Sequence, residues 1–377
     1  MSLGNRIAAE LKGDRTIWMI IAVLSLFSLL AVYSATGSLA WSARGGNTTI
    51  FLITHMVRLA FGLFLIYVFH LWHYRQFQRA APFLMLLTVP LLAFTLFFGQ
   101  SINDANRWLS IGGLSFQPSE FAKIALIIYI ARELTRKQDY ITSLRDAFLP
   151  IIVPVLIVCG LIAPANLSTS LVLFVTCIML MFIGRVSWQY ILLLGLLGLV
   201  VFAGLVAIGQ LYPEAGLVRV DTWISRVQEY LHSEDGGYQV QQAKIAIAKG
   251  GVIGEGPGNS IIRNFLPYSY ADFIYAIICE EYGLVGGTLV LALYVLLFLR
   301  NVKLVTKSPK AFGAFLAIGL SLMLTVQALA NIAVNVNLVP ATGLTLPLIS
   351  MGGTSMLFTC IALGMILSVS KFIESLE

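Results

Sequence analysis

Apolar stretches of about 20 residues recur along the whole 377-residue chain, and they limit its possible folds more than any other feature. As an α-helix, each stretch can span the ~30 Å hydrocarbon core of a bilayer. Composition agrees, since 58% of the residues are hydrophobic and only 11% are charged. Unbroken runs such as residues 190–208 exclude a transmembrane barrel, whose strands alternate over about 10 residues. The sequence therefore predicts an all-α polytopic membrane protein.

The apolar runs predict ten spans. They lie near residues 17–35, 51–70, 81–99, 118–134, 147–163, 167–184, 187–210, 272–299, 311–335 and 353–373. The length of the first run favours a retained span over a signal peptide. A long loop (about 211–271) separates the seventh and eighth spans, and a re-entrant segment precedes the tenth. We expect residues 1–377 to form one transmembrane domain without an appended soluble domain.

Basic residues fix the expected orientation. If the N-terminus is cytoplasmic, the inner segments hold fifteen of the 24 Lys and Arg residues, while the short outer loops hold only Arg44 and Arg107. Positive charge stays on the cytoplasmic face, so both termini are predicted to be cytoplasmic. The segments rich in Gly, Pro and polar residues (101–116, 211–271 and 335–353) then all face outward, which predicts an extracytoplasmic site.

The same residues exclude other classes of protein. Basic residues are scattered singly between apolar runs, without a patch of interleaved aromatics, so nucleic acid is not an expected partner. The four cysteines all lie inside apolar runs and lack CxxC spacing, so neither a disulfide framework nor a zinc site is indicated. Within the long outer loop, residues 222–231 and 238–249 have apolar residues at helical spacing, which predicts two surface helices.

Charged residues at the start of the fourth span have two interpretations. Glu120 and Lys123 are spaced i,i+3 and can pair with each other inside a capped helix start. Alternatively, Lys123 and nearby Arg107 flank an outward-facing cavity suited to an anionic diphosphate. Both interpretations stay open at this stage.

The eighth span contains three acids. Asp272 lies at its outer end, where it is either an ordinary N-cap or a functional carboxylate. Glu280 lies ~12 Å further along an ideal helix, so the two do not form the ~5 Å carboxyl pair of a retaining glycosidase. We expect Glu280 and Glu281 to be structural and to pair with a buried cation.

Two glycine-rich pieces complete the candidate site. Residues 250–260 contain a G-x-G pattern but no βαβ unit, which leaves either a flexible turn or an anion-binding nest of backbone amides. Residues 335–353 are apolar yet broken by Pro and Gly. Such backbone is tolerated at membrane depth only where protein covers it or where it lines a cavity.

Four segments in this order resemble the SEDS family (shape, elongation, division and sporulation) of ten-span peptidoglycan polymerases. They are residues 106–123, 254–258, 266–283 and 335–353. The motifs Gln-Pro-Ser-Glu and Thr-Leu-Pro-Leu-Ile-Ser are more similar to the division-type polymerases of this family than to the elongation-type ones. Three places depart from the family pattern: residues 266–272 lack its Glu and His, residues 164–169 lack its Asp, and Met351 replaces a Tyr.

The resemblance implies polymerisation of lipid II into glycan strands during cell division, at the outer face of a bacterial inner membrane. It implies an inverting glycosyltransferase with a polyprenyl-diphosphate-linked donor, with Asp272 as general base and with Arg107 and Lys123 at the diphosphate. Further substrate-binding residues expected from it are Gln117, Ser119, Glu120, Gly256, Gly258, Asn335, Pro340, Thr342, Ser350, Gly352 and Gly353.

Expected partners are lipid II, a class B penicillin-binding protein transpeptidase and other division proteins. No cofactor is certain, and a divalent cation (Mg²⁺ or Mn²⁺) is the open alternative. A lipid II flippase or transporter and an elongation-type polymerase are the competing functions, because transporters also use broken helices and intramembrane charge.

Overall fold

The computed structural model describes residues 12–37, 48–102, 105–111, 114–211, 220–232, 237–308 and 310–374. Its longer helices are α2 (Arg15–Ala35), α4 (Thr48–Leu71), α5 (Tyr74–Phe98), α6 (Pro118–Arg136), α7 (Leu149–Ile162), α8 (Leu167–Ile183), α9 (Trp188–Leu211), α10 (Val220–His232), α11 (Tyr238–Gly250), α12 (Ile274–Lys307), α13 (Ala311–Asn335) and α14 (Gly353–Glu374). Short turns of helix are η1 (Gln138–Tyr140), η2 (Leu144–Phe148) and η4 (Ile262–Asn264). The strands are β1 (Gln100–Ile102), β2 (Ala105–Ile111) and β3 (Leu114–Phe116).

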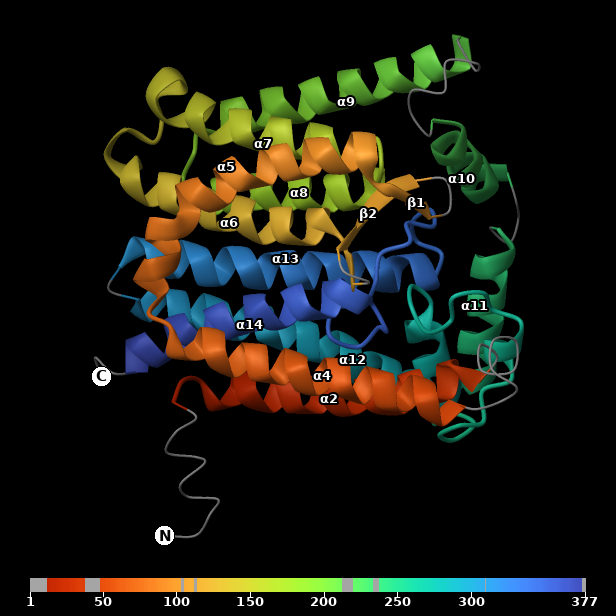
Figure 1. Cartoon of the computed structure of the whole chain (residues 1–377). Coiled ribbons are helices and arrows are strands. Elements are labelled where there is room, and N and C mark those ends of the chain that lie inside the picture. The colour runs from red at the N-terminus through yellow and green to blue at the C-terminus, as the bar shows by residue number, and fades with distance from the viewer. Residues whose placement is uncertain are drawn as a thin grey trace, which may run out of the picture.

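Each of the ten predicted spans coincides with a helix. Figure 1 shows these long helices side by side, between α9 at the top and α2 at the bottom. Among the described residues, seven helical segments are long and apolar enough to cross a membrane. Helix α6 is not among the seven, since it carries charged residues within its length. A multi-span helical fold is thus confirmed, and the count of ten membrane crossings stays a prediction.

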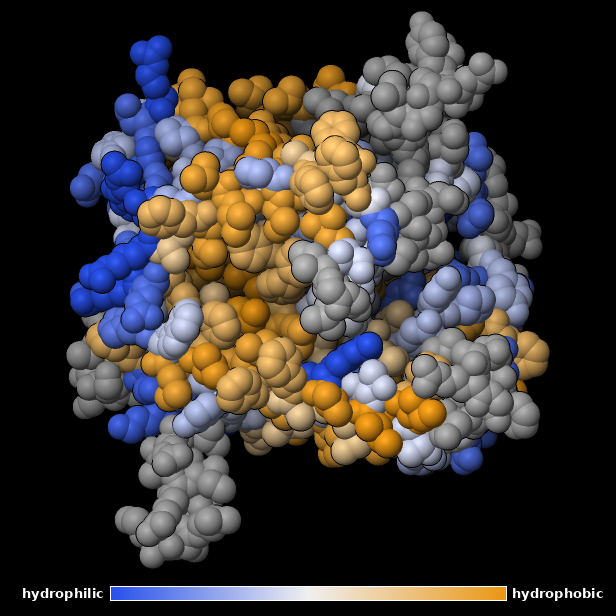
Figure 2. Space-filling view, viewed as in Figure 1, coloured by the Kyte–Doolittle hydropathy of each residue, from blue (hydrophilic) through white to orange (hydrophobic). Residues whose placement is uncertain are grey.

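The two ends of the bundle are polar and differ in structure. At one end, the Asp14 carboxylate lies 2.5 Å from Arg300 of α12, and the Asp14 N–H donates to Ser370 of α14 at 2.6 Å. The sheet and helices α10 and α11 lie at the other end (Figure 1). Hydrophilic residues gather at the ends and an apolar band lies between them (Figure 2). The predicted inner and outer segments therefore occupy opposite ends; Arg6, Arg44 and Arg219 lie outside the described residues.

Small residues let α4 and α14 pack closely. A Cβ on Gly62 would lie 2.6 Å from the Cys360 sulfur, and one on Gly364 would lie 2.8 Å from the Ile66 carbonyl oxygen. All four cysteines are buried and free.

The glycine-rich piece at 250–258 has a different role from either sequence interpretation. Helix α12 is interrupted at Gly283, whose φ of 65° breaks the helical hydrogen-bond ladder. The loop supplies the missing partners: Leu284 N–H donates to the Gly251 carbonyl at 2.9 Å, and Gly256 N–H donates to the Glu281 carbonyl at 3.0 Å. A Cβ on Gly254 would overlap the Glu281 carbonyl oxygen. The loop is therefore held in a fixed position against the interrupted helix, because its peptide groups are hydrogen-bonded to α12.

The all-α expectation needs one correction. Strands β1, β2 and β3 form a three-stranded antiparallel sheet in the order β1-β2-β3, within a segment expected to be a loop. Residues 112–113 are Gly-Gly, a dipeptide typical of two-residue hairpin loops, and this signal was available in the sequence.

The two helices predicted in the long outer loop are confirmed as α10 and α11. Both lie at the sheet end of the bundle (Figure 1). Their contact with a membrane surface stays a prediction.

Candidate functional site

Asp272 lies in a turn before α12, which begins at Ile274. It is not the N-cap, since that position is Phe273 and no side chain of the turn itself caps the helix. Instead, the Asn335 Oδ1 atom on α13 accepts the Ala276 N–H at 3.1 Å. The N-cap interpretation of Asp272 is therefore wrong, because a neighbouring helix provides the cap and leaves the carboxylate available.

Side chains from two other elements hold the backbone of this turn. Asn331 and Asn335 donate through their Nδ2 atoms to the Asp272 carbonyl at 2.7 and 3.1 Å. Ser350 donates to the Ala271 carbonyl at 2.5 Å and accepts the Leu346 N–H at 2.8 Å. The turn is thus fixed against α13 and the irregular segment 336–352, so Asp272 sits on a rigid support.

The Asp272 carboxylate is buried enough to change its chemistry. Its Oδ1 atom is buried and has no hydrogen-bond partner in the described part of the chain. Burial raises the pKa of Asp272 from 3.8 to about 6, while its own backbone N–H and the positive charge of Arg226 act in the opposite direction. A carboxylate with a pKa near the working pH is suited to accept a proton.

A cavity of about 200 Å³ lies between α10, α11 and the segment after α13. Arg226 and Pro340 are among its lining residues. Arg226 donates to the Ala341 carbonyl at 3.1 Å, and Tyr230 donates to the Leu338 carbonyl at 3.0 Å. The cavity is therefore lined by one cation, Arg226, whose positive charge acts on Asp272, and by one carboxylate, Glu229. Thr342 is half-buried on the same segment.

Glu120 and Lys123 form an internal pair at the start of α6. The Lys123 Nζ atom lies 3.0 Å from Glu120 and donates to the Gln327 Oε1 atom at 2.8 Å, and Lys123 is only 3% exposed. Ser355 donates to Glu120 at 3.1 Å. Gln327 in turn donates to the Thr345 carbonyl at 3.0 Å. The paired interpretation is confirmed, and the pair also links α6 to α13 and to the segment before α14.

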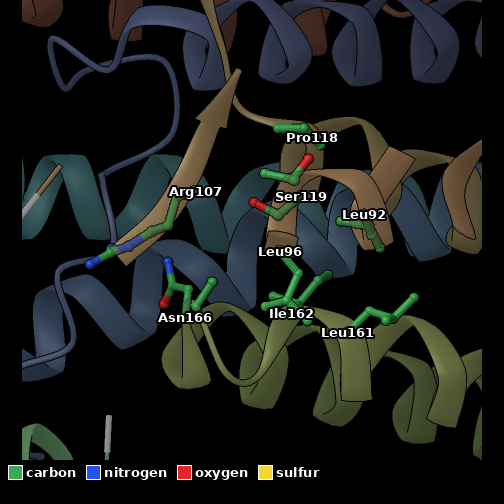
Figure 3. A pocket seen from close by; sticks show the side chains of 10 residues that line it. Leu92, Leu96, Arg107, Pro118, Ser119, Leu161, Ile162 and Asn166 are labelled. Carbon is green, nitrogen blue, oxygen red and sulfur yellow. The ribbon is translucent and has the colours of Figure 1, made fainter. Parts of the chain in front are cut away.

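Arg107 lines a separate, narrow cleft with apolar residues of α5 and α7 (Figure 3). Its open volume of about 20 Å³ suits about one water molecule. Asn166 lies beside Arg107 in this view, and Ser119 lines the same cleft. Gln117 donates to Ser119 at 3.1 Å through its side chain and to Thr354 at 3.3 Å through its N–H. Lys123 is not among the residues that line this cleft.

Glu280 and Glu281 lie near the break in α12. Glu280 forms an ion pair with Lys249 of α11 at 3.1 Å and accepts the Ile261 N–H at 3.0 Å. The expected cation partner is therefore present, but it is not buried, since the Lys249 side chain is 29% exposed. Glu281 accepts from the Ser34 hydroxyl, which also accepts from Arg263 at 2.9 Å. These acids thus attach the glycine loop and α2 to α12. Gly258 lies in the loop with a positive φ, while Gly352 directly precedes α14 and Gly353 is its first residue.

Sequence reasoning missed three supporting residues, Gln327 and Asn331 on α13 and Arg226 on α10, whereas Asn335 was predicted as a site residue. Gln327, Asn331 and Asn335 recur every four residues along an otherwise apolar helix, so they share one face. This polar stripe was a readable signal of a buried polar contact. Arg226 carried no such signal, because its proximity to Asp272 depends on how the outer loop folds back.

The residues present give little support for a resident metal. Among the described residues, no three His, Cys, Asp or Glu side chains gather as a ligand set. Mg²⁺ is often held by one or two carboxylates together with substrate phosphates. A divalent cation that arrives with the substrate therefore stays a prediction.

The fold and the site together define a polytopic membrane protein with a rigidly held, partly desolvated carboxylate at one end of its helical bundle. Residues 14–375 match the family described as "Cell cycle protein", which comprises FtsW, RodA and SpoVE, and the chain belongs to this family. The SEDS resemblance is thereby confirmed.

Named relatives span nearly the full chain. One is "Stage V sporulation protein E" of Bacillus subtilis, 32% identical over 95% of this chain and 97% of the relative. Another is "Probable peptidoglycan glycosyltransferase FtsW" of Coxiella burnetii, 33% identical over 95% of this chain and 96% of the relative.

Two solved structures are similar to this fold. One is described as "Structural coordination of polymerization and crosslinking by a peptidoglycan synthase complex", with a TM-score of 0.75, 26% identity and coverage of 96% of this chain and 98% of that one. The other is the rod shape determining protein RodA of Thermus thermophilus, with a TM-score of 0.68, 26% identity and coverage of 95% and 96%.

Proposed function

We propose that this protein is a peptidoglycan glycosyltransferase that polymerises lipid II at the outer face of the bacterial cytoplasmic membrane. The observation that carries the proposal is the Asp272 carboxylate, which is partly desolvated and unbonded at Oδ1. The backbone carbonyl of Asp272 is held by α13, before the start of α12. Several relatives named peptidoglycan glycosyltransferase support the reaction class.

Asp272 would act as the general base. It accepts the proton of an acceptor sugar hydroxyl while that oxygen forms a bond to the anomeric carbon of the donor. The bond between this carbon and the donor diphosphate breaks, and the diphosphate leaves with its electron pair. A diphosphate with neutralised charge is a good leaving group, so one carboxylate suffices and no carboxylic acid is needed. Direct displacement inverts the anomeric centre.

Arg107 and Lys123 are the proposed cations for the diphosphate, with Arg226 as a third, because it lines a cavity and its charge acts on Asp272. The Arg107 cleft has room for about one water, so a diphosphate binds there only after the cleft widens. Lys123 would exchange its hydrogen bond to Gln327 for one to the ligand. The matching test is donor use: Arg107→Ala and Lys123→Ala should slow turnover most at low lipid II.

The direct test is polymerisation of purified lipid II, followed as glycan chains on a gel. Asp272→Asn keeps the shape of the side chain and removes the base, so we expect a loss of roughly 10²- to 10⁴-fold. Asp139→Asn is the matched control, because it changes an exposed acid in η1 at the opposite end of α6 from the proposed site. Normal glycan chains from Asp272→Asn would overturn the assignment.

Lipid II transport is the competing function, and the break in α12 beside the ion pair of buried Glu280 with half-buried Lys249 favours it. The same preparation, reconstituted in vesicles, separates the two by lipid II translocation. Under the polymerase proposal, Asp272→Asn loses glycan polymerisation. Any lipid II translocation by the wild-type protein should be equally present in this variant.

We propose the division type of polymerase, with a class B penicillin-binding protein transpeptidase as partner. The FtsW names of several relatives support the first part. A similar structure described by polymerization and crosslinking in one complex supports the second. Cells depleted of the protein should form filaments without septa; loss of rod shape would indicate the elongation type instead.

A further inference from the structure

We propose that a pocket at the opposite end of the bundle binds the headgroup of an anionic phospholipid that carries a hydroxyl, of the phosphatidylglycerol type. The pocket has a volume of about 360 Å³ and lies where the end of α4, the start of α5 and the end of α14 meet. Lys12, His73 and Lys371 are among its lining residues. It lies far from Asp272 along the helices and has no part in the proposed polymerisation.

The pocket is built rather than incidental. The backbone of Lys12 is anchored because its carbonyl contacts His70 Nε2 at 2.5 Å, and the next residue but one donates its N–H to Ser370 at 2.6 Å. Ser368 of α14 donates to the Trp72 carbonyl, which ties α14 to the turn between α4 and α5. Both lysines are therefore attached to fixed backbone around one cavity.

The two histidines define the polar pattern inside. The His73 Nδ1 atom accepts the Arg75 N–H at 3.1 Å, so the neutral ring carries its proton on Nε2 and has a donor to offer. A carbonyl can only accept, so the contact with Lys12 places the His70 proton on Nε2. His70 is fully buried, lines the cavity, and its Nδ1 atom has no hydrogen-bond partner among the described residues.

This pattern matches a phosphoglycerol better than a bare phosphate. Two ammonium groups and one N–H donor suit phosphate oxygens, which only accept. The His70 Nδ1 atom is an acceptor, so a bare phosphate leaves it unsatisfied. A headgroup hydroxyl satisfies it once the lining side chains shift to open access to this buried atom. The ligand should therefore carry both a phosphate and a hydroxyl.

A lipid is the source that the surroundings favour. Leu71 and Trp72 are each 49% exposed at the rim of the pocket, where the apolar faces of α4 and α5 begin. Trp is enriched at membrane interfaces, and basic pockets between helices on the cytoplasmic side bind anionic headgroups. Acyl chains could then continue along the apolar faces while the headgroup fills the cavity.

The test is native mass spectrometry of the full-length protein in detergent, titrated with phosphatidylglycerol or with phosphatidylethanolamine of the same acyl chains. We expect preferential binding of phosphatidylglycerol. Lys12→Gln combined with Lys371→Gln should weaken it about 30-fold, from the usual contribution of a lysine near an anionic lipid. The matched control is Lys303→Gln with Lys310→Gln, which removes two exposed lysines outside the pocket.

Three outcomes would overturn the proposal: equal binding of the two lipids, unchanged binding in the pocket variant, or an equal loss in the control. A fourth contradicting outcome is competition by millimolar inorganic phosphate, which would identify a free-phosphate site and refute the lipid assignment. If the double variant fails to fold, Lys12→Arg with Lys371→Arg must retain binding, and wild-type binding must weaken as salt rises.

Discussion

The pH dependence of polymerisation tests the chemistry of Asp272 most sharply. The pKa of this carboxyl is raised to about 6 by burial, and a general base works only when it is ionised. A base with that pKa is about 9% ionised at pH 5 and about 91% ionised at pH 7. The second-order rate constant kcat/KM should therefore fall about tenfold from pH 7 to pH 5.

The size of this fall separates a buried base from an exposed one. An Asp at the ordinary value of 3.8 is still about 94% ionised at pH 5, so its rate would change by less than about 10%. The assay is the initial rate of glycan formation at low lipid II across this pH range. Unfolding temperatures measured at each pH serve as the control for loss of folded protein. A flat profile in the folded protein would refute the assignment of Asp272 as a desolvated base.

A substitution at Arg226 checks the cause of the pKa. The positive charge of Arg226 lowers the pKa of Asp272, so Arg226→Gln should move the acid limb of the profile to higher pH. An unmoved limb would show that Arg226 does not act on this carboxyl in solution.

Three further predictions concern stability, measured as unfolding temperature in detergent. Asp272→Asn should stabilise the protein at pH 7.5 by at most about 3 kcal/mol, because a raised carboxyl pKa means that ionisation opposes folding as pH rises from about 4 through 6; a lower unfolding temperature would contradict this. Gly283→Ala should destabilise by about 3 kcal/mol or more, since its φ is 65° and a Cβ would overlap the Val252 carbonyl oxygen, whereas Gly160→Ala, with open space around it, should not. Glu120→Gln leaves Lys123 buried without its partner and should cost roughly 3–5 kcal/mol, with recovery when Lys123→Met is added; an unchanged unfolding temperature would refute the pairing.

The helices could be predicted from the sequence because membrane spans follow a single dominant rule. Every apolar run coincides with a helix, and α10 and α11 were predicted from apolar spacing alone. The break in α12 was not predicted, because the loop that supplies hydrogen-bond partners around Gly283 consists of residues 250–256, outside the helix itself. Hydropathy predicts which segments are buried in lipid, but it does not predict contacts between segments.

The candidate site was predicted in part for the same reason. Asp272 and Asn335 are recognisable from their segments, yet that Asn335 caps α12 in place of Asp272 follows only from the packing of α13. The pairing of Glu120 with Lys123 was one of two open interpretations, because sequence spacing permits a pair and cannot show that Gln327 completes it.

A continuous chain of polar contacts joins the two parts of the proposed site. Lys123 bonds to Gln327, Gln327 bonds to the Thr345 carbonyl, and Asn331 bonds to the adjacent Leu344 carbonyl and to the Asp272 carbonyl. Each buried donor in this chain has its acceptor, so moving one member leaves another unsatisfied at a cost of about 1–3 kcal/mol. In the proposed binding step, Lys123 moves away from Gln327 and leaves the Gln327 Oε1 atom without its donor. Under the proposal, we therefore expect occupation of the diphosphate site to be linked energetically to the placement of Asp272 through α13, although none of the described side chains contacts both.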